Sequence, residues 1–107
     1  MIDLEPRHLE SVRRILAAHL PGVEVRAFGS RVRGTARRFS DLDLAVVADG
    51  PLPADRLEAL RDAFSASDLP ILVDVLDWHT VSPAFRAVID ARYEVVYRPV
   101  HNQGLPA

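Results

Sequence analysis

The sequence predicts a small α/β fold in which helices pack against a mixed β-sheet, and three observations support this class. Segments with apolar residues at helical spacing alternate along the chain with short segments of strand character. The chain has 107 residues, of which 49% are hydrophobic and 26% charged, which is typical of a folded domain with one modest core. No apolar run approaches the ~20 residues that cross a bilayer. We therefore expect one domain over residues 1–98, followed by a flexible tail over residues 99–107.

The N-terminal part of the chain predicts a helix followed by a strand. Pro6 suits the first position of a helix over residues 6–20, and Pro21 and Gly22 end it. Apolar and charged residues then alternate over residues 23–27, which indicates a strand with one solvated face. The apolar stripe of the helix consists of Leu9, Val12, Leu16 and Leu20.

A short helix and a second strand are expected next. Residues 30–33 follow a glycine and are predicted to open a short helix, and residues 41–47 form the second strand. Asp49, Gly50 and Pro51 are a turn signal that closes this strand.

The remaining sequence predicts two helices and two strands. An amphipathic helix is expected over residues 53–67. Residues 71–76 are apolar except for Asp74, which predicts a strand that is buried on both faces. A serine N-cap followed by proline opens a helix over residues 82–91, and residues 93–98 are expected to form a short edge strand.

Composition excludes several classes of function. The absence of cysteine removes disulfides, thiolate catalysis and cysteine-ligated zinc. The formal net charge of −2 argues against an extended nucleic-acid surface. The first residues do not resemble a signal peptide, so we expect a cytoplasmic protein without a membrane partner. All thirteen basic side chains are arginine, which reflects either coding background or selection for bidentate phosphate binding.

Three acidic residues in predicted strands are candidate metal ligands. Asp41 and Asp43 are two residues apart, so their side chains leave the same face of a strand. Asp74 interrupts an apolar strand, where an ionised carboxylate is costly unless it is paired or bound to a metal. Converging carboxylates repel one another, and an all-oxygen ligand set favours Mg²⁺ over zinc. Asp77, at the end of the same strand, is the second choice for the third ligand.

A glycine and a serine before the acids form a candidate phosphate site. Gly29 permits close approach of a phosphate to the backbone, and the Ser30 hydroxyl adds a hydrogen-bond donor at the start of the short helix. Of the arginines nearby, we expect Arg31 and Arg33 to contact phosphate. The side chains of Arg37 and Arg38 fit a solvated basic face equally well. Five arginines lie within thirteen residues: Arg26, Arg31, Arg33, Arg37 and Arg38.

These motifs resemble the signature of the nucleotidyltransferase superfamily that is related to DNA polymerase beta. The resemblance rests on Gly-Ser-Arg-Val-Arg-Gly over residues 29–34 and on Phe-Ser-Asp-Leu-Asp-Leu over residues 39–44. It covers most of the chain and is strongest for the minimal nucleotidyltransferases. It implies a nucleotidyltransferase-like fold in which the Gly-Ser loop binds the β- and γ-phosphates of ATP. It also implies that two Mg²⁺ ions are bound by Asp41, Asp43 and Asp74.

The resemblance implies a biological role as well. Minimal nucleotidyltransferases of this size resemble antitoxins that pair with a HEPN-domain ribonuclease toxin and transfer AMP from ATP to a tyrosine of that toxin. We therefore expect a Mg²⁺-dependent protein adenylyltransferase with a HEPN-domain toxin as its partner. One alternative is an antitoxin without catalytic activity that neutralises its partner by binding. A further alternative is an adenylyltransferase for small molecules of the aminoglycoside type.

Overall fold

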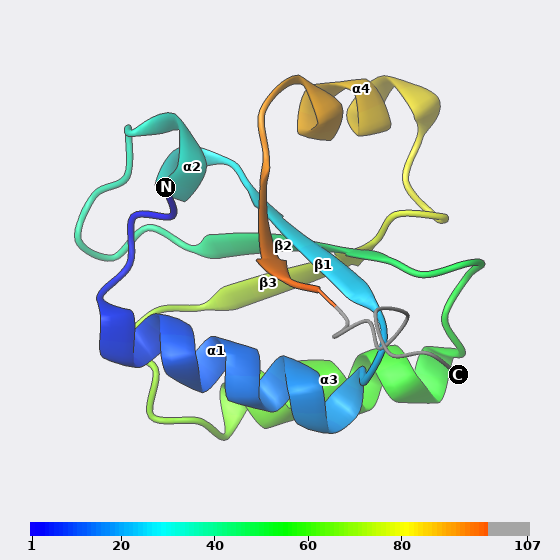
Figure 1. Cartoon of the computed structure of the whole chain (residues 1–107), viewed down its shortest axis with the longest axis horizontal. Coiled ribbons are helices and arrows are strands. Elements are labelled where there is room, and N and C mark those ends of the chain that lie inside the picture. The colour runs from blue at the N-terminus through cyan, green and yellow to red at the C-terminus, as the bar shows by residue number, and fades with distance from the viewer. Residues whose placement is uncertain (99–107) are drawn as a thin grey trace, which may run out of the picture.

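Helices and strands alternate along the chain as the sequence predicts (Figure 1). The computed structural model describes residues 1–98, so the expected flexible tail over residues 99–107 lies outside the described residues. All eight predicted elements are present, with ends that differ from the prediction by no more than two residues. They are α1 (Pro6–His19), β1 (Glu24–Phe28), α2 (Ser30–Arg33), β2 (Leu42–Val47), α3 (Ala54–Ser65), β3 (Val73–Asp77), α4 (Pro83–Ala91) and β4 (Glu94–Tyr97).

The four strands form one mixed sheet in the order β3-β2-β1-β4. β1 pairs antiparallel with both β2 and β4, whereas β2 and β3 run parallel and are connected through α3. A parallel pair needs a long crossover connection, and α3 supplies it. The α/β class with a mixed sheet is confirmed.

The two faces of the sheet are covered differently (Figure 1). α1 and α3 lie side by side on one face and enclose the main hydrophobic core with Leu42, Leu44 and Val46 of β2. α4 lies on the opposite face, where a smaller cluster contains Phe28 of β1 and Ile89 of α4. Because strand residues alternate between faces, every second residue of β2 and β3 points toward the face that carries α4.

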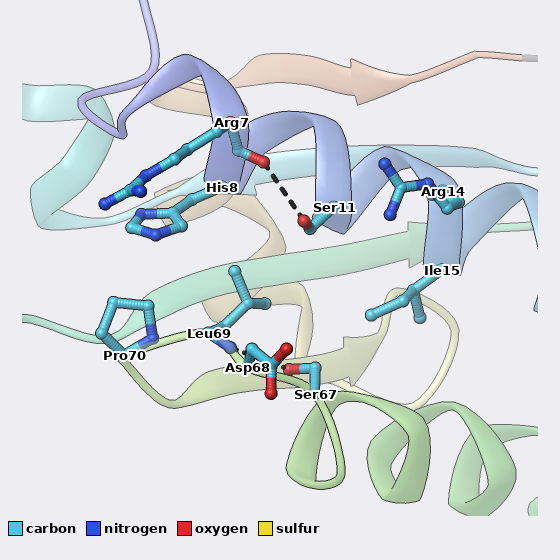
Figure 2. A pocket seen from close by; sticks show the side chains of 9 residues that line it. All are labelled: Arg7, His8, Ser11, Arg14, Ile15, Ser67, Asp68, Leu69 and Pro70. Carbon is cyan, nitrogen blue, oxygen red and sulfur yellow. Dashed lines mark hydrogen bonds between the residues drawn. The ribbon is translucent and has the colours of Figure 1, made fainter.

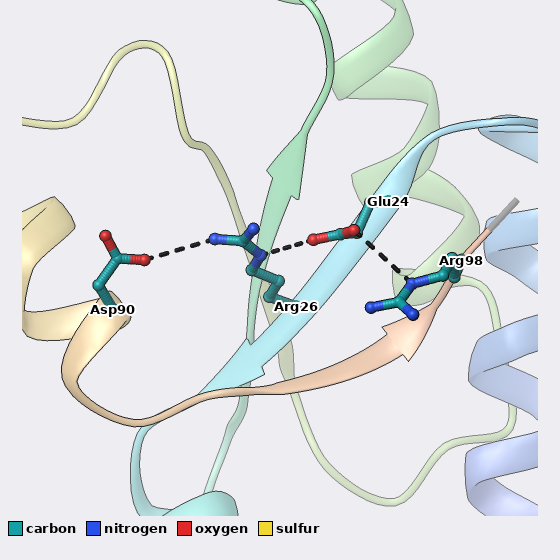
Figure 3. Close-up of polar contacts among 4 residues, drawn as sticks. All are labelled: Glu24, Arg26, Asp90 and Arg98. Carbon is teal, nitrogen blue, oxygen red and sulfur yellow. Dashed lines mark hydrogen bonds and ion pairs between the residues drawn. The ribbon is translucent and has the colours of Figure 1, made fainter.

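α4 is held against β1 by a chain of charged side chains (Figure 3). Arg26 donates from Nε to Glu24 at 2.6 Å and from Nη1 to Asp90 of α4 at 3.4 Å, and Arg98 approaches Glu24 at 3.8 Å. The Arg26 guanidinium also lies 4.4 Å from the centre of the Tyr93 ring. Arg26, which belongs to the arginine cluster noted in the sequence, therefore fastens α4 to the sheet.

The third strand differs from its prediction. β3 is an edge strand, not a strand buried on both faces, and Leu72 just before it is 73% exposed. Asp74 is exposed as well, so its carboxylate does not need a partner to offset burial. In this run, Ile71, Val73 and Val75 pack on the main core. On the other face Leu72 and Asp74 are exposed, whereas Leu76 packs against the smaller cluster that contains Ile89 of α4. Among residues 1–98, no helix has the length and apolar character needed to cross a bilayer.

Candidate active site

The three candidate metal ligands leave the face of the sheet that carries α4. In the register of the parallel pair, Asp43 of β2 lies directly opposite Asp74 of β3. Their neighbours Leu42, Leu44 and Val75 point into the main core, so strand alternation directs both carboxylates to the opposite face. Asp41 precedes β2 by one residue and is exposed. By the same alternation it is on the side of Asp43.

Asp43 is the electrostatic centre of this group. Its pKa is raised, first because the carboxyl is partly buried and then because Asp74 and Asp41 add negative charge nearby. The positive charge of Arg33 acts in the opposite direction and lowers the same pKa. Negative charge is thus concentrated at one point that a cation is suited to neutralise.

The donor chemistry of the site suits a hard divalent cation. All three candidate ligands are carboxylates, and Mg²⁺ prefers oxygen donors. Within the described part of the chain, however, no three His, Cys, Asp or Glu side chains are gathered closely enough to hold a metal ion together. Asp41, Asp43 and Asp74 therefore occupy neighbouring positions on one face without forming a common ligand shell.

Gly29 lies directly against Asp43. Its backbone has φ +81° and ψ −156°, a region that essentially only glycine adopts. A Cβ atom at this position would overlap Oδ2 of Asp43. The Gly29 carbonyl accepts the N–H groups of Val32 and Arg33 at 3.0 Å each and so begins α2. The glycine thus brings the start of α2, with the Ser30 hydroxyl, next to the central acid.

Two arginines of α2, which the sequence assigns to phosphate contact, have different surroundings. Arg33 is exposed, and its charge acts on Asp43, which places it near the acids. Arg31 is only 6% exposed, and its guanidinium donates hydrogen bonds to the carbonyls of Asp3, Arg37, Arg38 and Ser40. The contacts of Arg31 are thus internal to the fold, and a guanidinium with four carbonyl partners has few donors left for the phosphate contact expected from the sequence.

Asp77, the second choice for the third ligand, has a structural role. It is 2% exposed. Because Asp77 lies three residues after Asp74, its side chain leaves the opposite face of β3, toward α1 and α3. Its carboxylate accepts the N–H of Leu52 at 2.8 Å and the N–H of His79 at 2.9 Å. It fixes the connection after β2 to the turn after β3.

This assignment predicts a contrast between two neighbouring acids. We expect Asp77→Ala to lower the free energy of unfolding by about 2–4 kcal/mol, because two backbone donors lose a charged acceptor. Asp74→Ala should change stability little, because Asp74 is exposed. Denaturant unfolding of both variants measures this difference, and equal losses of stability would contradict the assignment.

Two grooves among residues 1–98 lie away from the acids. A groove of about 580 Å³ runs between α1 and the connection from α3 to β3. Arg7 and His8 lie opposite Pro70 in it, and Arg14 lies farther along α1 beside Ile15 (Figure 2). A second groove of about 350 Å³ continues from it toward the loop before β2. No acid of the candidate site lines either of these two grooves.

Comparison with known proteins identifies the family. The model of the nucleotidyltransferase domain family matches residues 9–97, which include the Gly29-Ser30 loop and all three acids. The chain belongs to this nucleotidyltransferase family. The resemblance drawn from the two motifs is thereby confirmed.

Relatives of this nucleotidyltransferase have been named for a specific reaction. A protein of Haemophilus influenzae named "Probable protein adenylyltransferase MntA" is 45% identical over 95 residues, which cover 89% of this chain and 83% of the relative. A chain of a crystal structure described as a toxin–antitoxin with AMP-PNP superposes with a TM-score of 0.71 at 25% identity, covering 90% of this chain and 76% of that one.

A further solved structure shows the same fold. A chain of the complex described as a tri-AMPylated Shewanella oneidensis HEPN toxin with MNT antitoxin superposes with a TM-score of 0.66. It is 20% identical, and the match covers 89% of this chain and 73% of that one. At this identity the likeness concerns the fold, and it confirms the expected nucleotidyltransferase-like architecture.

Proposed function

We propose that this chain is a Mg²⁺-dependent protein adenylyltransferase that transfers AMP from ATP to a tyrosine of a HEPN-type ribonuclease toxin and thereby acts as its antitoxin. The proposal is supported by the relative named for protein adenylylation at 45% identity. It is also supported by the described structure of a toxin–antitoxin with an ATP analogue, which has the same fold. The observation that carries it is the contact between Gly29 and Asp43, because this contact joins a phosphate-binding loop to the acids.

The residues of the chain have distinct parts in this reaction. Ser30 donates its hydroxyl to the triphosphate, next to the first free N–H groups of α2, and Arg33 adds a charged donor. The carboxylates of Asp41, Asp43 and Asp74, which form no common ligand shell by themselves, would converge to hold Mg²⁺. The bound ion would neutralise the triphosphate and acidify an acceptor hydroxyl. Two such ions are expected from the family resemblance.

Asp74 is suited to move the proton. The bond between the α-phosphorus and the oxygen that joins it to the β-phosphorus breaks, and pyrophosphate leaves with that oxygen, while a bond from the tyrosine oxygen to the α-phosphorus forms. The hydroxyl proton passes to a carboxylate oxygen of Asp74, which is exposed near the open edge of the sheet. An acceptor from another protein can therefore reach this carboxylate from solvent.

Co-expression with a HEPN-domain partner tests the proposal. We expect intact-mass spectrometry of the partner to show a gain of one or more AMP units with the wild-type chain and none with Asp41→Asn. Growth protection that persists in the Asp41→Asn strain without any mass gain would favour neutralisation by binding alone. AMP transfer to aminoglycosides with no transfer to the partner would favour the small-molecule reaction.

Arg33 is expected to affect ATP binding in particular. Loss of one charge-assisted hydrogen bond to phosphate costs about 1.5–3 kcal/mol, so Arg33→Gln should raise KM for ATP by about 10- to 100-fold. Because Arg33 lowers the pKa of Asp43, its removal should also move the acidic limb of the pH–activity profile to higher pH. Arg37→Gln, a change at an exposed arginine of the next loop, is the matched control, and an equal rise in KM there would contradict a specific role for Arg33.

A further inference from the structure

One buried guanidinium joins three segments of the chain. Arg31 donates from Nε to the Ser40 carbonyl at 3.0 Å, from Nη1 to the Asp3 carbonyl at 2.7 Å, and from Nη2 to the carbonyls of Arg37 and Arg38 at 3.3 and 3.1 Å. The Arg31 carbonyl in turn accepts the N–H of Asp3 at 2.7 Å. The N-terminal segment, α2 and the turn over residues 37–40 therefore meet at this side chain.

The chemistry of this contact requires arginine. Arg31 takes part in none of the ion pairs found within residues 1–98, so carbonyl dipoles alone offset its buried charge. The planar guanidinium has five donors in a fixed fork and can reach carbonyls on several sides. Lysine has three donors on one nitrogen and cannot reproduce this arrangement. At this position the use of arginine therefore follows from the structure.

The contact lies between the two halves of the candidate site. Arg31 directly follows Ser30, and Ser40, whose carbonyl it binds, directly precedes Asp41. The turn is also closed from within, because the N–H of Arg37 donates to Oγ of Ser40 at 2.8 Å. Any movement of the guanidinium would shift the phosphate loop relative to the first acid.

We infer that Arg31 is a positioning residue, whose guanidinium fixes Asp41 relative to the Gly29-Ser30 loop by holding the Ser40 carbonyl. It touches neither ATP nor the acceptor. The inference rests on the proposed function, because it assigns Arg31 to the same reaction. It also implies that the arginine affects the catalytic rate and not the affinity for ATP.

The test replaces Arg31 by lysine, which keeps the charge and removes the fork. We expect kcat of Arg31→Lys for AMP transfer to fall at least about 10-fold, since misplacing a catalytic group by 1 Å can cost about 100-fold. KM for ATP at saturating Mg²⁺ should stay within about 3-fold of the wild-type value, because the residues that bind ATP in the ground state are unchanged. Amide hydrogen exchange over residues 37–41 should become faster by about 10-fold or more as the turn loosens.

A second arginine provides the structural control. Arg13 donates from Nε to the Val96 carbonyl at 2.9 Å, on the side of the sheet that faces α1. Arg13→Lys also removes a guanidinium–carbonyl contact, but we expect it to leave kcat and the exchange of residues 37–41 as in the wild type. A general loss of stability would affect both variants alike.

Each outcome supports or overturns the inference. A raised KM with unchanged kcat in Arg31→Lys would mean that the guanidinium binds the triphosphate, and unchanged exchange over residues 37–41 would mean that it does not hold the turn. If Arg31→Lys does not fold, Arg31→Gln, which keeps two N–H donors on one nitrogen, should lower kcat without raising KM, and an unchanged kcat would overturn the inference. Hydrogen exchange does not depend on AMP transfer, so an inactive wild-type chain would contradict the proposed function alone.

Discussion

Asp43→Asn is expected to make the protein more stable and inactive. Folding raises the pKa of Asp43 above its ordinary value of 3.8. Between pH 3.8 and the raised pKa, the native state therefore binds more protons than the unfolded state. The contribution of Asp43 to stability is therefore fully present below pH 3.8 and is lost as the pH rises through the raised pKa. The asparagine does not ionise and avoids this loss. At neutral pH without divalent cations, the variant should consequently melt at a higher temperature than the wild type.

The activity of the same variant should fall by about 1,000-fold. The asparagine supplies no negative charge for Mg²⁺, and the charge stabilisation that a catalytic metal supplies is worth several kcal/mol. Thermal unfolding from pH 3 to pH 8 and the rate of AMP transfer measure the two effects. The gain in melting temperature should disappear at the acid end of this range. A variant that is less stable than the wild type at neutral pH would contradict the accumulation of negative charge around Asp43.

Gly29→Ala is the second change with a large expected effect. The backbone conformation of Gly29 costs a residue with a Cβ atom about 1–3 kcal/mol, and here the Cβ would also overlap Oδ2 of Asp43. The loop and the acid would have to separate. We expect the variant to unfold at lower denaturant concentration and to lose about 100-fold in kcat, because the phosphate loop and the acids no longer keep their spacing.

Two other glycines provide matched controls for this change. Gly22 and Gly34 also have positive φ, at +80° and +79°, but a Cβ at either position would have no atom within 4 Å. Gly22→Ala and Gly34→Ala should therefore lose stability through backbone strain alone and retain kcat. If Gly34→Ala lowers kcat as much as Gly29→Ala does, the overlap with Asp43 is not the cause.

The order of the elements could be predicted from local sequence. Helical spacing, proline at the start of α1 and α4, and the Gly29 and Pro21-Gly22 breaks define boundaries that depend on neighbouring residues only. The burial of β3 could not be predicted in this way. An apolar run is compatible with a central strand and with an edge strand, and only the pairing of β3 on one side distinguishes them.

The candidate site shows the same division. Asp41 and Asp43 could be placed on one face because the period of a strand is two residues. The same period separates Asp74 from Asp77. Asp74 lies two residues before Leu76 and shares its face of β3, whereas Asp77 lies one residue after Leu76 and is on the other face. Choosing between the two acids therefore requires knowing which face of the sheet carries α4. The partners of Arg31 lie up to 28 residues away and are backbone carbonyls, which have no sequence signature. The position of Arg31 next to the Gly29-Ser30 loop predicts phosphate contact, and sequence alone could not reveal these carbonyl partners.

The position of the label in ATP tests the central claim most directly. The wild-type chain, a HEPN-domain partner and Mg²⁺ are incubated in parallel with ATP labelled at the α-phosphate and with ATP labelled at the γ-phosphate, with Asp41→Asn as the control. The proposed reaction predicts that the partner retains the α-label only, that the γ-label leaves with pyrophosphate, and that the control transfers neither. Retention of the γ-label, or no transfer of either label at saturating ATP and Mg²⁺, would contradict the assignment of this chain as a protein adenylyltransferase.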